Sequence, residues 1–305
     1  MRIAHLSDLH LLSLEGAIPF RLLNKRLTGY LNLRFHRSLV HRPFAVKAAA
    51  QEIRRLGIDH VVITGDVSNL ALEREFGLVC AFLDDDLGLS PDRVSLVPGN
   101  HDVYTQGSYR SHRFSRYFEP YLVSDLPEIQ ANAAGFPFVH LRGPVAFIGL
   151  STALPRPPLM ASGALGTVQL RAFERALAHP EVKQRTAVVL QHHPWHNPDS
   201  YTRTALEGLF DARSQGRLLH QLTRGLLLHG HLHRRIHRRL PTKGGHVDIV
   251  GATSASLLHD SDERMAGFNV YDIADDGRIE SITSHRLIPD DHSFREVRIP
   301  NAWST

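Results

Sequence analysis

The hexapeptide Val97-Pro98-Gly99-Asn100-His101-Asp102 joins the end of a predicted strand to a turn of polar side chains. Val94 and Leu96 belong to the same short apolar run, which predicts that the strand is buried. Proline and glycine in succession should end this strand abruptly. A turn at the carboxyl end of a strand is where α/β proteins usually carry their chemistry. The tetrad of residues 99–102 is therefore a candidate site.

Length and composition describe an ordinary globular chain. Its 305 residues can bury a large core, and 42% hydrophobic with 22% charged residues is typical of soluble proteins. No apolar run approaches the length of a membrane span, and Arg2 leads at once into a strand-like segment rather than a signal peptide. The single cysteine, Cys80, fits a reducing compartment. We expect one domain over residues 1–305, in the cytoplasm.

Two features of the composition favour a metal and an anionic partner. Histidine, the commonest metal ligand, occurs 21 times, and the net charge of +4 would concentrate anions. Residues 16–51 contain no acidic side chain, and apolar residues recur in the first part of this segment at helical spacing. We interpret residues 15–44 as a helical insertion. It is either a surface helix packed on the domain or a cap over the site, in which case residues 17–42 could contact lipid or a membrane surface.

Four other predicted strands end in the same way as the first. Their turns carry Asp8 and His10, Asp66, His192 and His193, and His231 and His233. Each motif is weak alone, because a lone Asp-x-His or His-x-His is common. Together they supply oxygen and nitrogen ligands suited to a borderline divalent metal, with no thiolate among them. If the five strands belong to one sheet, chance is a poor explanation for this pattern.

Between these turns the periodicity predicts helices over residues 45–56, 70–87 and 167–178. Gly57 should end the first of them. Residues 103–140 are less regular and mix aromatic with basic side chains. We interpret them as a helical face that covers the core, although such a mixture could also contact nucleotide bases and phosphates.

On these residues the sequence resembles the calcineurin-like metallophosphoesterase superfamily. Its five signatures stand here, in the family's order, as Asp8-Leu9-His10, Gly65-Asp66, Gly99-Asn100-His101-Asp102, His192-His193-Pro194 and Gly230-His231-Leu232-His233. The resemblance implies an α/β fold, a four-layer α/β/β/α sandwich of two mixed sheets flanked by helices. It also implies two divalent metal ions at the carboxyl ends of the strands.

The resemblance further implies a ligand set. One ion would be held by Asp8, His10, Asp66 and His233, and the other by Asp66, Asn100, His192 and His231. Asp66 would bridge the two ions, and His193 would support packing around His192. Manganese, iron and zinc all accept such nitrogen and oxygen ligands, so the native metal stays open.

Two adjacent metal ions can share a water, lower its pKa and clamp the attacking and leaving oxygens in line. His101 adjoins a ligand without being one. We expect His101 to contact the phosphoryl group and protonate the leaving oxygen, with Asp102 orienting it. The alternative for His101 is plain structural support.

The amino-acid sequences of the motifs most resemble those of bacterial class III cyclic-nucleotide phosphodiesterase-like proteins. We therefore expect a phosphodiesterase in which a metal-bridging hydroxide attacks a cyclic nucleotide or a similar small anionic diester. The alternatives are a pyrophosphohydrolase of a UDP-linked lipid A precursor, which would suit a lipid-facing segment 17–42, and a nuclease. A non-catalytic binding module is a more remote one. Nothing in the sequence indicates an obligate protein partner.

Overall fold

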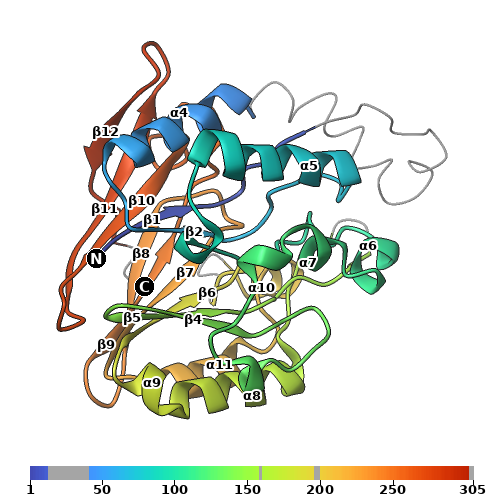
Figure 1. Ribbon diagram of the computed structural model, residues 1–305, viewed down its shortest axis with the longest axis vertical. Helices are drawn as coiled ribbons and strands as arrows, with labels where there is room; N and C mark the ends of the chain where they lie inside the picture. The colour runs from blue at the N-terminus through green and yellow to red at the C-terminus, as the bar shows by residue number, and fades with distance from the viewer. Residues whose placement is uncertain (13–40, 158–159, 196–199, 302–305) are drawn as a thin grey trace.

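The computed structural model describes residues 1–12, 41–157, 160–195 and 200–301. The helical insertion expected at 15–44 and the lipid contact expected at 17–42 fall almost wholly on residues 13–40, which lie outside the described residues. The described chain forms two six-stranded sheets, with helices on the outer side of each (Figure 1).

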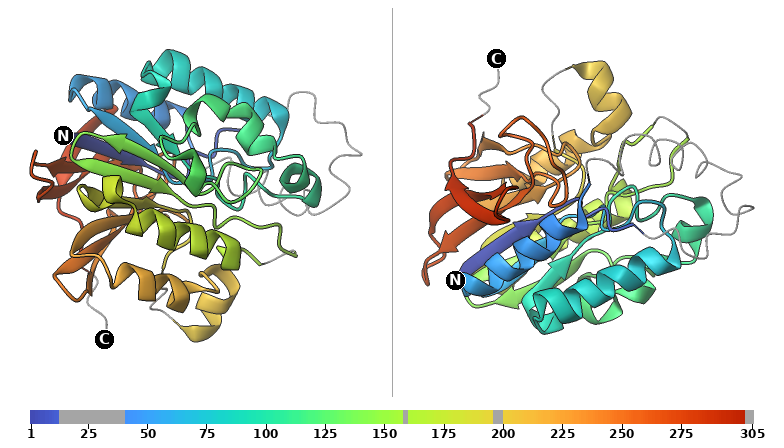
Figure 2. Two further views of the ribbon diagram at one scale, coloured as in Figure 1. Left: turned by 60° about the horizontal axis from the view of Figure 1, so that its bottom comes forward. Right: turned by 90° about the horizontal axis from the view of Figure 1, so that it is seen from above.

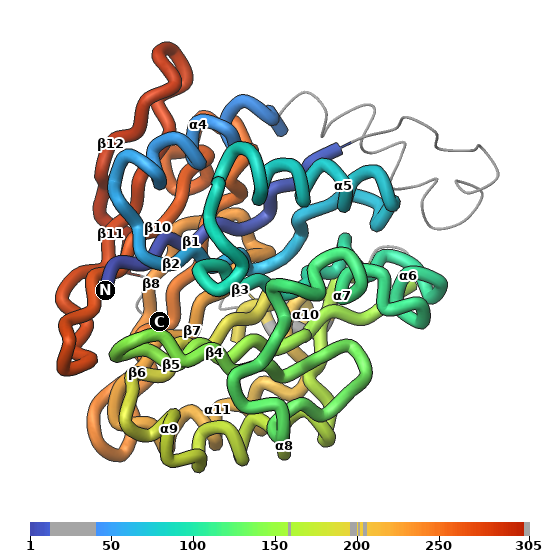
Figure 3. The backbone as a smooth tube through the Cα atoms, viewed as in Figure 1, coloured from blue at the N-terminus to red at the C-terminus, as the bar shows by residue number. Residues whose placement is uncertain are grey.

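The first sheet has the order β12-β11-β10-β1-β2-β3, with β1, β2 and β3 parallel to one another. Its strands are β1 (Arg2–Leu6), β2 (His60–Ile63), β3 (Val94–Leu96), β10 (Gly267–Ile273), β11 (Ile279–Ile288) and β12 (Ser293–Val297). β1 also pairs antiparallel with β10 from the far end of the chain, so blue and orange segments lie side by side in Figure 3. The first sheet is therefore mixed.

The second sheet has the order β4-β5-β6-β7-β9-β8, in which β5, β6, β7 and β9 are parallel. Its strands are β4 (Phe138–Arg142), β5 (Val145–Gly149), β6 (Thr186–Leu190), β7 (Arg224–His229), β8 (Ile236–Pro241) and β9 (His246–Gly251). The antiparallel strands β4 and β8 form its two edges, so this sheet is mixed as well.

Helices cover both outer faces. On one side lie α4 (Pro43–Arg55) and α5 (Glu73–Ala81), and on the other α8 (Gly166–Ala178), α9 (Pro180–Lys183) and α11 (Ala212–Leu219) (Figures 1 and 2). The shorter helices are α6 (Gln106–Arg110), α7 (Arg113–Tyr117) and α10 (Tyr201–Glu207). This confirms the predicted four-layer α/β/β/α sandwich. None of the helices in the described part of the chain combines the length and apolarity needed to cross a bilayer.

Local sequence explains the helix bounds. α4 buries one face of small and β-branched residues, and Gly57 follows it with a φ of +63°, a conformation that suits glycine. The helix predicted over residues 70–87 begins later, at Glu73, and its last turn, Phe82–Leu87, is a π-helix. Glu75 explains the late start, because its side chain accepts the backbone N–H groups of Leu70 and Leu72 and so caps α5.

One apolar core fills the space between the sheets. Ile63 and Leu96 of the first sheet belong to the same buried cluster as Phe147, Val188 and Leu228 of the second. The strands that face this core are covered on both sides, which is why they read as unbroken apolar runs rather than as alternating patterns.

The expectation that five ligand-bearing strands share one sheet was wrong. β1, β2 and β3 belong to the first sheet, whereas β6 and β7 belong to the second. The turns still meet because the two sheets pack face to face on the common core and their parallel strands end at the same edge of the sandwich. The site therefore lies between two sheets, which no single-sheet pattern could have indicated.

Strands β4, β8 and β12 were not predicted. β8 reads Ile-His-Arg-Arg-Leu-Pro, and charged residues with a terminal proline are typical of an edge strand that must not pair further. Such a strand carries too weak an alternation to be recognised without its neighbour β9.

Candidate metal centre

The first group of polar atoms gathers where β1 and β7 end. The Nε2 atoms of His10 and His233 are 3.3 Å apart, and Asp8 Oδ1 lies 3.0 Å from His233 Nε2. Asp8 Oδ2 accepts the Ser7 hydroxyl at 2.6 Å and the His231 backbone N–H at 3.1 Å. Among the described residues, the buried Oδ1 has no hydrogen bond of good geometry, although His233 Nε2 lies close to it. A buried carboxylate oxygen among imidazole nitrogens is the environment expected around a cation.

The second group is a nearly regular triangle. Asn100 Oδ1 lies 3.1 Å from both His192 Nε2 and His231 Nδ1, and these two nitrogens are 3.2 Å apart. Ligand atoms about 2.1 Å from one ion, at angles between tetrahedral and octahedral, are separated by about 3.0–3.4 Å. The spacing of the triangle, and that of His10 with His233, therefore equals the spacing of atoms around a metal ion.

Asp66 connects the two groups. Its Oδ2 lies 3.4 Å from His192 Nε2, and Asp8, Asp66 and His192 each offer a ligand atom within 4.8 Å of the other two. The Asp66 Oδ1 atom accepts the backbone N–H of His101 at 2.8 Å, which fixes the carboxylate. This is the position required of a bridging ligand.

The hydrogen bonds of His192 show which of its ring nitrogens faces the second group of polar atoms. Its Nδ1 lies 2.8 Å from the carbonyl oxygen of Thr64, which can only accept, so Nδ1 carries a proton and Nε2 faces the other ligand atoms. Burial lowers the pKa of His192, but Asp66 and Asp8 outweigh it and raise that pKa to about 9. Nε2 thus holds either a proton or a metal ion against these carboxylates.

Backbone strain marks the same residues. Asp8, His10, Asp66, His231 and His233 all have φ between +47° and +67°, which is uncommon for residues other than glycine. Strain of this kind persists only where the surrounding structure imposes it, and it is concentrated at functional sites. The strained residues follow three of the five strands, β1, β2 and β7.

Two glycines of the signatures make the close approach possible. A Cβ on Gly230 would collide with Ser7 Oγ and Asp8 Oδ2, and a Cβ on Gly99 would collide with Asp66 Oδ1. Their role is therefore to admit the carboxylates.

His101 lies beside the ligands, with its ring 5.2 Å from that of His10. Its Nδ1 donates to the carbonyl oxygen of Asn69 at 2.7 Å, and its Nε2 lies 4.0 Å from Asp66 Oδ2. The Asn69 carbonyl thus orients the ring.

The prediction that Asp102 orients His101 was wrong. The Asp102 carboxylate instead accepts the backbone N–H groups of Val67, Ser68 and Gly99 and the Ser68 hydroxyl, at 2.8–3.3 Å. Neighbouring side chains of this turn point in different directions, so Asp102 points into the protein while His101 faces the ligands. Burial and the charge of Asp66 raise the pKa of Asp102 to about 7.

His193 has a different environment from His192. Its Nδ1 lies 2.8 Å from Thr152 Oγ1 and its Nε2 lies 2.7 Å from the carbonyl oxygen of Ala161, so both ring nitrogens have partners away from the ligand atoms. Burial, with His231 and His192 nearby, lowers its pKa well below the usual value. The geometry favours His192 as the ligand.

The sequence reasoning missed His41. Its ring lies 4.7 Å from that of His10 and 5.9 Å from that of His233. No signature contains it, and its only signal in the sequence was its place in the acid-free segment 16–51.

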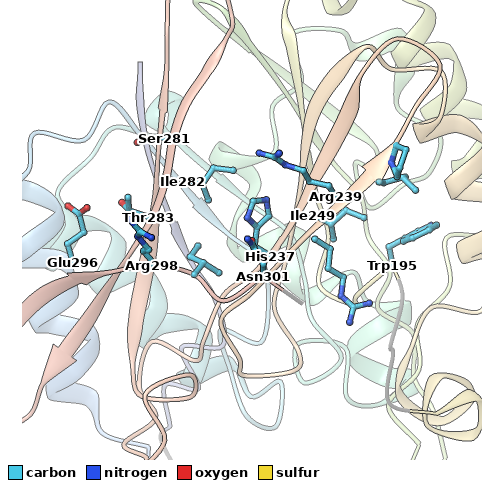
Figure 4. Close-up of a pocket in the computed structure, with 14 residues that line it drawn as sticks. Trp195, His237, Arg239, Ile249, Ser281, Ile282, Thr283, Glu296, Arg298 and Asn301 are labelled. Atoms are coloured by element: carbon cyan, nitrogen blue, oxygen red, sulfur yellow. The ribbon is translucent and has the colours of Figure 1, made fainter. Parts of the chain in front are cut away.

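A separate pocket of about 780 Å³ lies between β8 and β11 (Figure 4). Arg238, Arg239 and Arg298 line it together with apolar side chains such as Ile249 and Ile282. None of the seven predicted metal ligands lines it, so this hollow is not the metal centre.

Comparisons with known proteins indicate the family and the fold. A family model described as calcineurin-like phosphoesterase matches residues 1–235. No curated protein matches the sequence significantly. A dimetal phosphatase from Danio rerio superposes with a TM-score of 0.57 at 13% identity, covering 99% of both chains.

Two further solved structures share the fold. A purple acid phosphatase from yellow lupin (Lupinus luteus) seeds has a TM-score of 0.58 at 13% identity, covering 99% of this chain and 54% of its own. A 5'-nucleotidase precursor from Thermus thermophilus has a TM-score of 0.50 at 14% identity, covering 96% of this chain and 56% of its own. This chain thus spans about half the length of these two proteins, and identities this low establish the fold alone.

Proposed function

Because this chain belongs to the calcineurin-like phosphoesterase family, we propose that it hydrolyses phosphodiesters with two divalent metal ions, acting on cyclic nucleotides or similar small diesters. The observation that supports this most is the arrangement of donor atoms. Asn100, His192 and His231 form one set at metal-ligand spacing, Asp8, His10 and His233 form another, and Asp66 lies between them.

The donor set fits borderline divalent cations. It contains nitrogen and oxygen atoms without sulfur, which suits manganese, iron or zinc. When bound, two such ions polarise a phosphoryl group and lower the pKa of a water molecule towards neutrality. The residues that would hold them are the seven expected from the sequence: Asp8, His10, Asp66, Asn100, His192, His231 and His233.

The charge of the site favours a diester. Asp8 and Asp66 are the only anionic groups among the seven, because Asn100 and metal-binding imidazoles are neutral. Two divalent ions would thus keep two positive charges in excess. A monoanionic diester and a negatively charged nucleophile neutralise that excess, whereas a phosphomonoester carries about 1.5 to 2 negative charges at pH 7 and would exceed it.

In its doubly protonated form, His101 would supply the Nε2 proton to the leaving oxygen and keep its Nδ1 proton on the Asn69 carbonyl. Asn69 holds its Nδ1, so Nε2 is the atom presented on the side of Asp66. A general acid must lie within reach of the departing oxygen, and a side chain next to the ligands satisfies that requirement. Asp102 contributes indirectly, by fixing the turn that carries Asn100 and His101.

The test is a substrate panel with the purified, manganese-loaded protein. We expect cyclic AMP and bis-nitrophenyl phosphate to be cleaved faster than nitrophenyl phosphate, without lipid or detergent. A preference for monoesters, or cleavage of a UDP-linked lipid pyrophosphate only, would overturn the diester proposal in favour of a monoesterase or of the lipid precursor hydrolase. Selective cleavage of DNA would indicate a nuclease. Two bound metal ions without hydrolysis of any substrate would indicate a non-catalytic binding module.

The role of His101 has its own test. His101→Ala should retain both metal ions and lose more activity on alkyl diesters than on nitrophenyl diesters, since nitrophenol leaves without a proton. A loss of metal, or an equal loss on both substrates, would contradict this role.

A further inference from the structure

His41 is held against the metal centre by its own backbone. It forms an antiparallel bridge with Leu257, and the N–H of Arg42 donates to the carbonyl oxygen of Ser256 at 2.8 Å. Pro43 then begins α4. The ring of His41 is therefore placed by the pairing of residues 41–42 with residues 256–257.

A chain of hydrogen bonds through two serine hydroxyls fits a proton on Nδ1 of His41. Ser254 Oγ donates its single proton to the carbonyl oxygen of Asp8 at 2.6 Å. When Ser256 donates its proton across the 3.2 Å contact between the two serine hydroxyls, Ser254 is the acceptor. Ser256 Oγ consequently accepts from His41 Nδ1, 2.7 Å away.

In this arrangement the neutral His41 ring has its proton on Nδ1 and its lone pair on Nε2. A hydrogen bond from the far ring nitrogen to a fixed oxygen is the usual arrangement for a histidine that binds a metal, because it sets the tautomer and the ring orientation. His192 shows the same arrangement with Thr64.

We infer that His41 Nε2 is a further ligand of the ion that Asp8, His10, Asp66 and His233 would hold. His10, His41 and His233 each offer a ring nitrogen within 4.8 Å of the other two. Around one ion in octahedral geometry, adjacent nitrogens are about 3.0 Å apart and opposite ones about 4.2 Å. The 4.8 Å limit is little more than the distance between opposite ligands, so the three nitrogens lie close enough to share one ion. The inference rests on the proposed function, since it takes this site to hold an ion.

This ligand would make the two ions unequal. The ion beside His41 would have five protein ligands and the other four, with Asp66 shared between them. We expect the first ion to be held more tightly and to exchange more slowly than the second. The same ion would tie the start of α4 to the end of β1, so metal loading would stabilise residues 41–43 against local opening.

The experiment is a titration of metal-free protein with Co²⁺, followed by calorimetry and by the visible absorption of the bound ion. The wild-type protein should take up two ions of unequal affinity. His41→Ala should weaken the tighter one by at least about tenfold and intensify its absorption bands, as expected for a lower coordination number. Ser256→Ala, which keeps the imidazole but removes its partner, should act in the same direction by a smaller factor. His220→Ala, an exposed histidine, is the matched control.

The outcomes separate this inference from the proposed function. Wild-type protein that fails to bind two ions would overturn both. If His41→Ala binds two ions with wild-type affinity and spectrum, only the His41 inference is overturned. If the metal titration of that variant is unchanged but its KM for substrate is raised, His41 is a substrate contact and the inference is again overturned. Thermal unfolding of each variant, and metal titration of His41→Gln, test whether a folding defect is the cause of any lost metal binding.

Discussion

The carboxylate of Asp102 accepts both the backbone N–H and the hydroxyl of Ser68, at 2.9 and 2.8 Å. This pair joins the turn after β3 to the turn after β2, and so fixes Asn100 relative to Asp66. The two turns that carry Asn100 and Asp66 are thus held together by Asp102, whose own side chain points away from the candidate metal centre.

Asp102→Ala should therefore act on stability and metal binding together. Removing a buried carboxylate that satisfies four donors should cost about 2–4 kcal/mol of unfolding free energy. The loosened turn should also weaken the ion at Asn100, as measured by urea denaturation and metal analysis. A variant of normal stability and metal content that has lost only turnover would restore Asp102 to a catalytic role.

Gly230→Ala should lower metal content because the new methyl group would displace Ser7 and the Asp8 carboxylate. Elemental analysis after dialysis should show less metal per protein molecule in the Gly230→Ala variant than in the wild-type protein. Gly77→Ala in α5 is the matched control, since nothing lies within 4 Å of its added methyl group, and it should be neutral or slightly stabilising. Equal metal content in both variants would count against the packing role of Gly230.

The adjacent histidines 192 and 193 should give opposite results. His192→Ala should lose about one of two bound ions, because its Nε2 is a corner of the ligand triangle. His193→Ala should retain both ions and lose about 1–3 kcal/mol of stability, since it abandons two buried hydrogen bonds. If His193→Ala loses an ion and His192→Ala does not, the ligand assignment is reversed.

Glu75 should make stability fall as the pH rises from about 4.5 to about 7. Burial raises its pKa to about 7 from 4.5, although the backbone N–H groups of Leu72 and Leu70 favour the charged form. A raised pKa in the folded state means that the contribution is fully present below pH 4.5 and lost as pH rises through 7.

Glu75→Gln keeps the protonated shape at every pH. Its unfolding free energy relative to the wild-type protein should therefore increase by about 1–3 kcal/mol between about pH 5 and 8.5, measured by urea denaturation. A difference that is constant over this range would show that Glu75 ionises normally in the folded protein.

The fold and most of the centre were predictable from sequence because the information is local. A strand that ends in proline and glycine, followed by Asn100 and His101, identifies a turn and its chemistry without any neighbour. Five such turns in the order of a known family, from Asp8 to His233, were enough to indicate the sandwich, the metals and the ligand set.

Other features depended on distance through space. The division of the five turns between two sheets, the contacts of Asp102, and the edge strand β8 follow from how strands pair and pack, which no local pattern records. The left-handed backbone at five ligand positions is likewise imposed by the packing around them.

Residue type and position at a strand end can be read from the chain alone, and they were enough to predict which side chains could bind a metal. Which of their atoms meet at ligand spacing depends on how the two sheets pack, so that became visible in the folded protein. The tertiary structure gave the two adjacent histidines different surroundings: His192 Nε2 lies among the predicted ligand atoms, whereas both ring nitrogens of His193 have partners elsewhere. It also brought His41, far from every signature, beside His10 and His233.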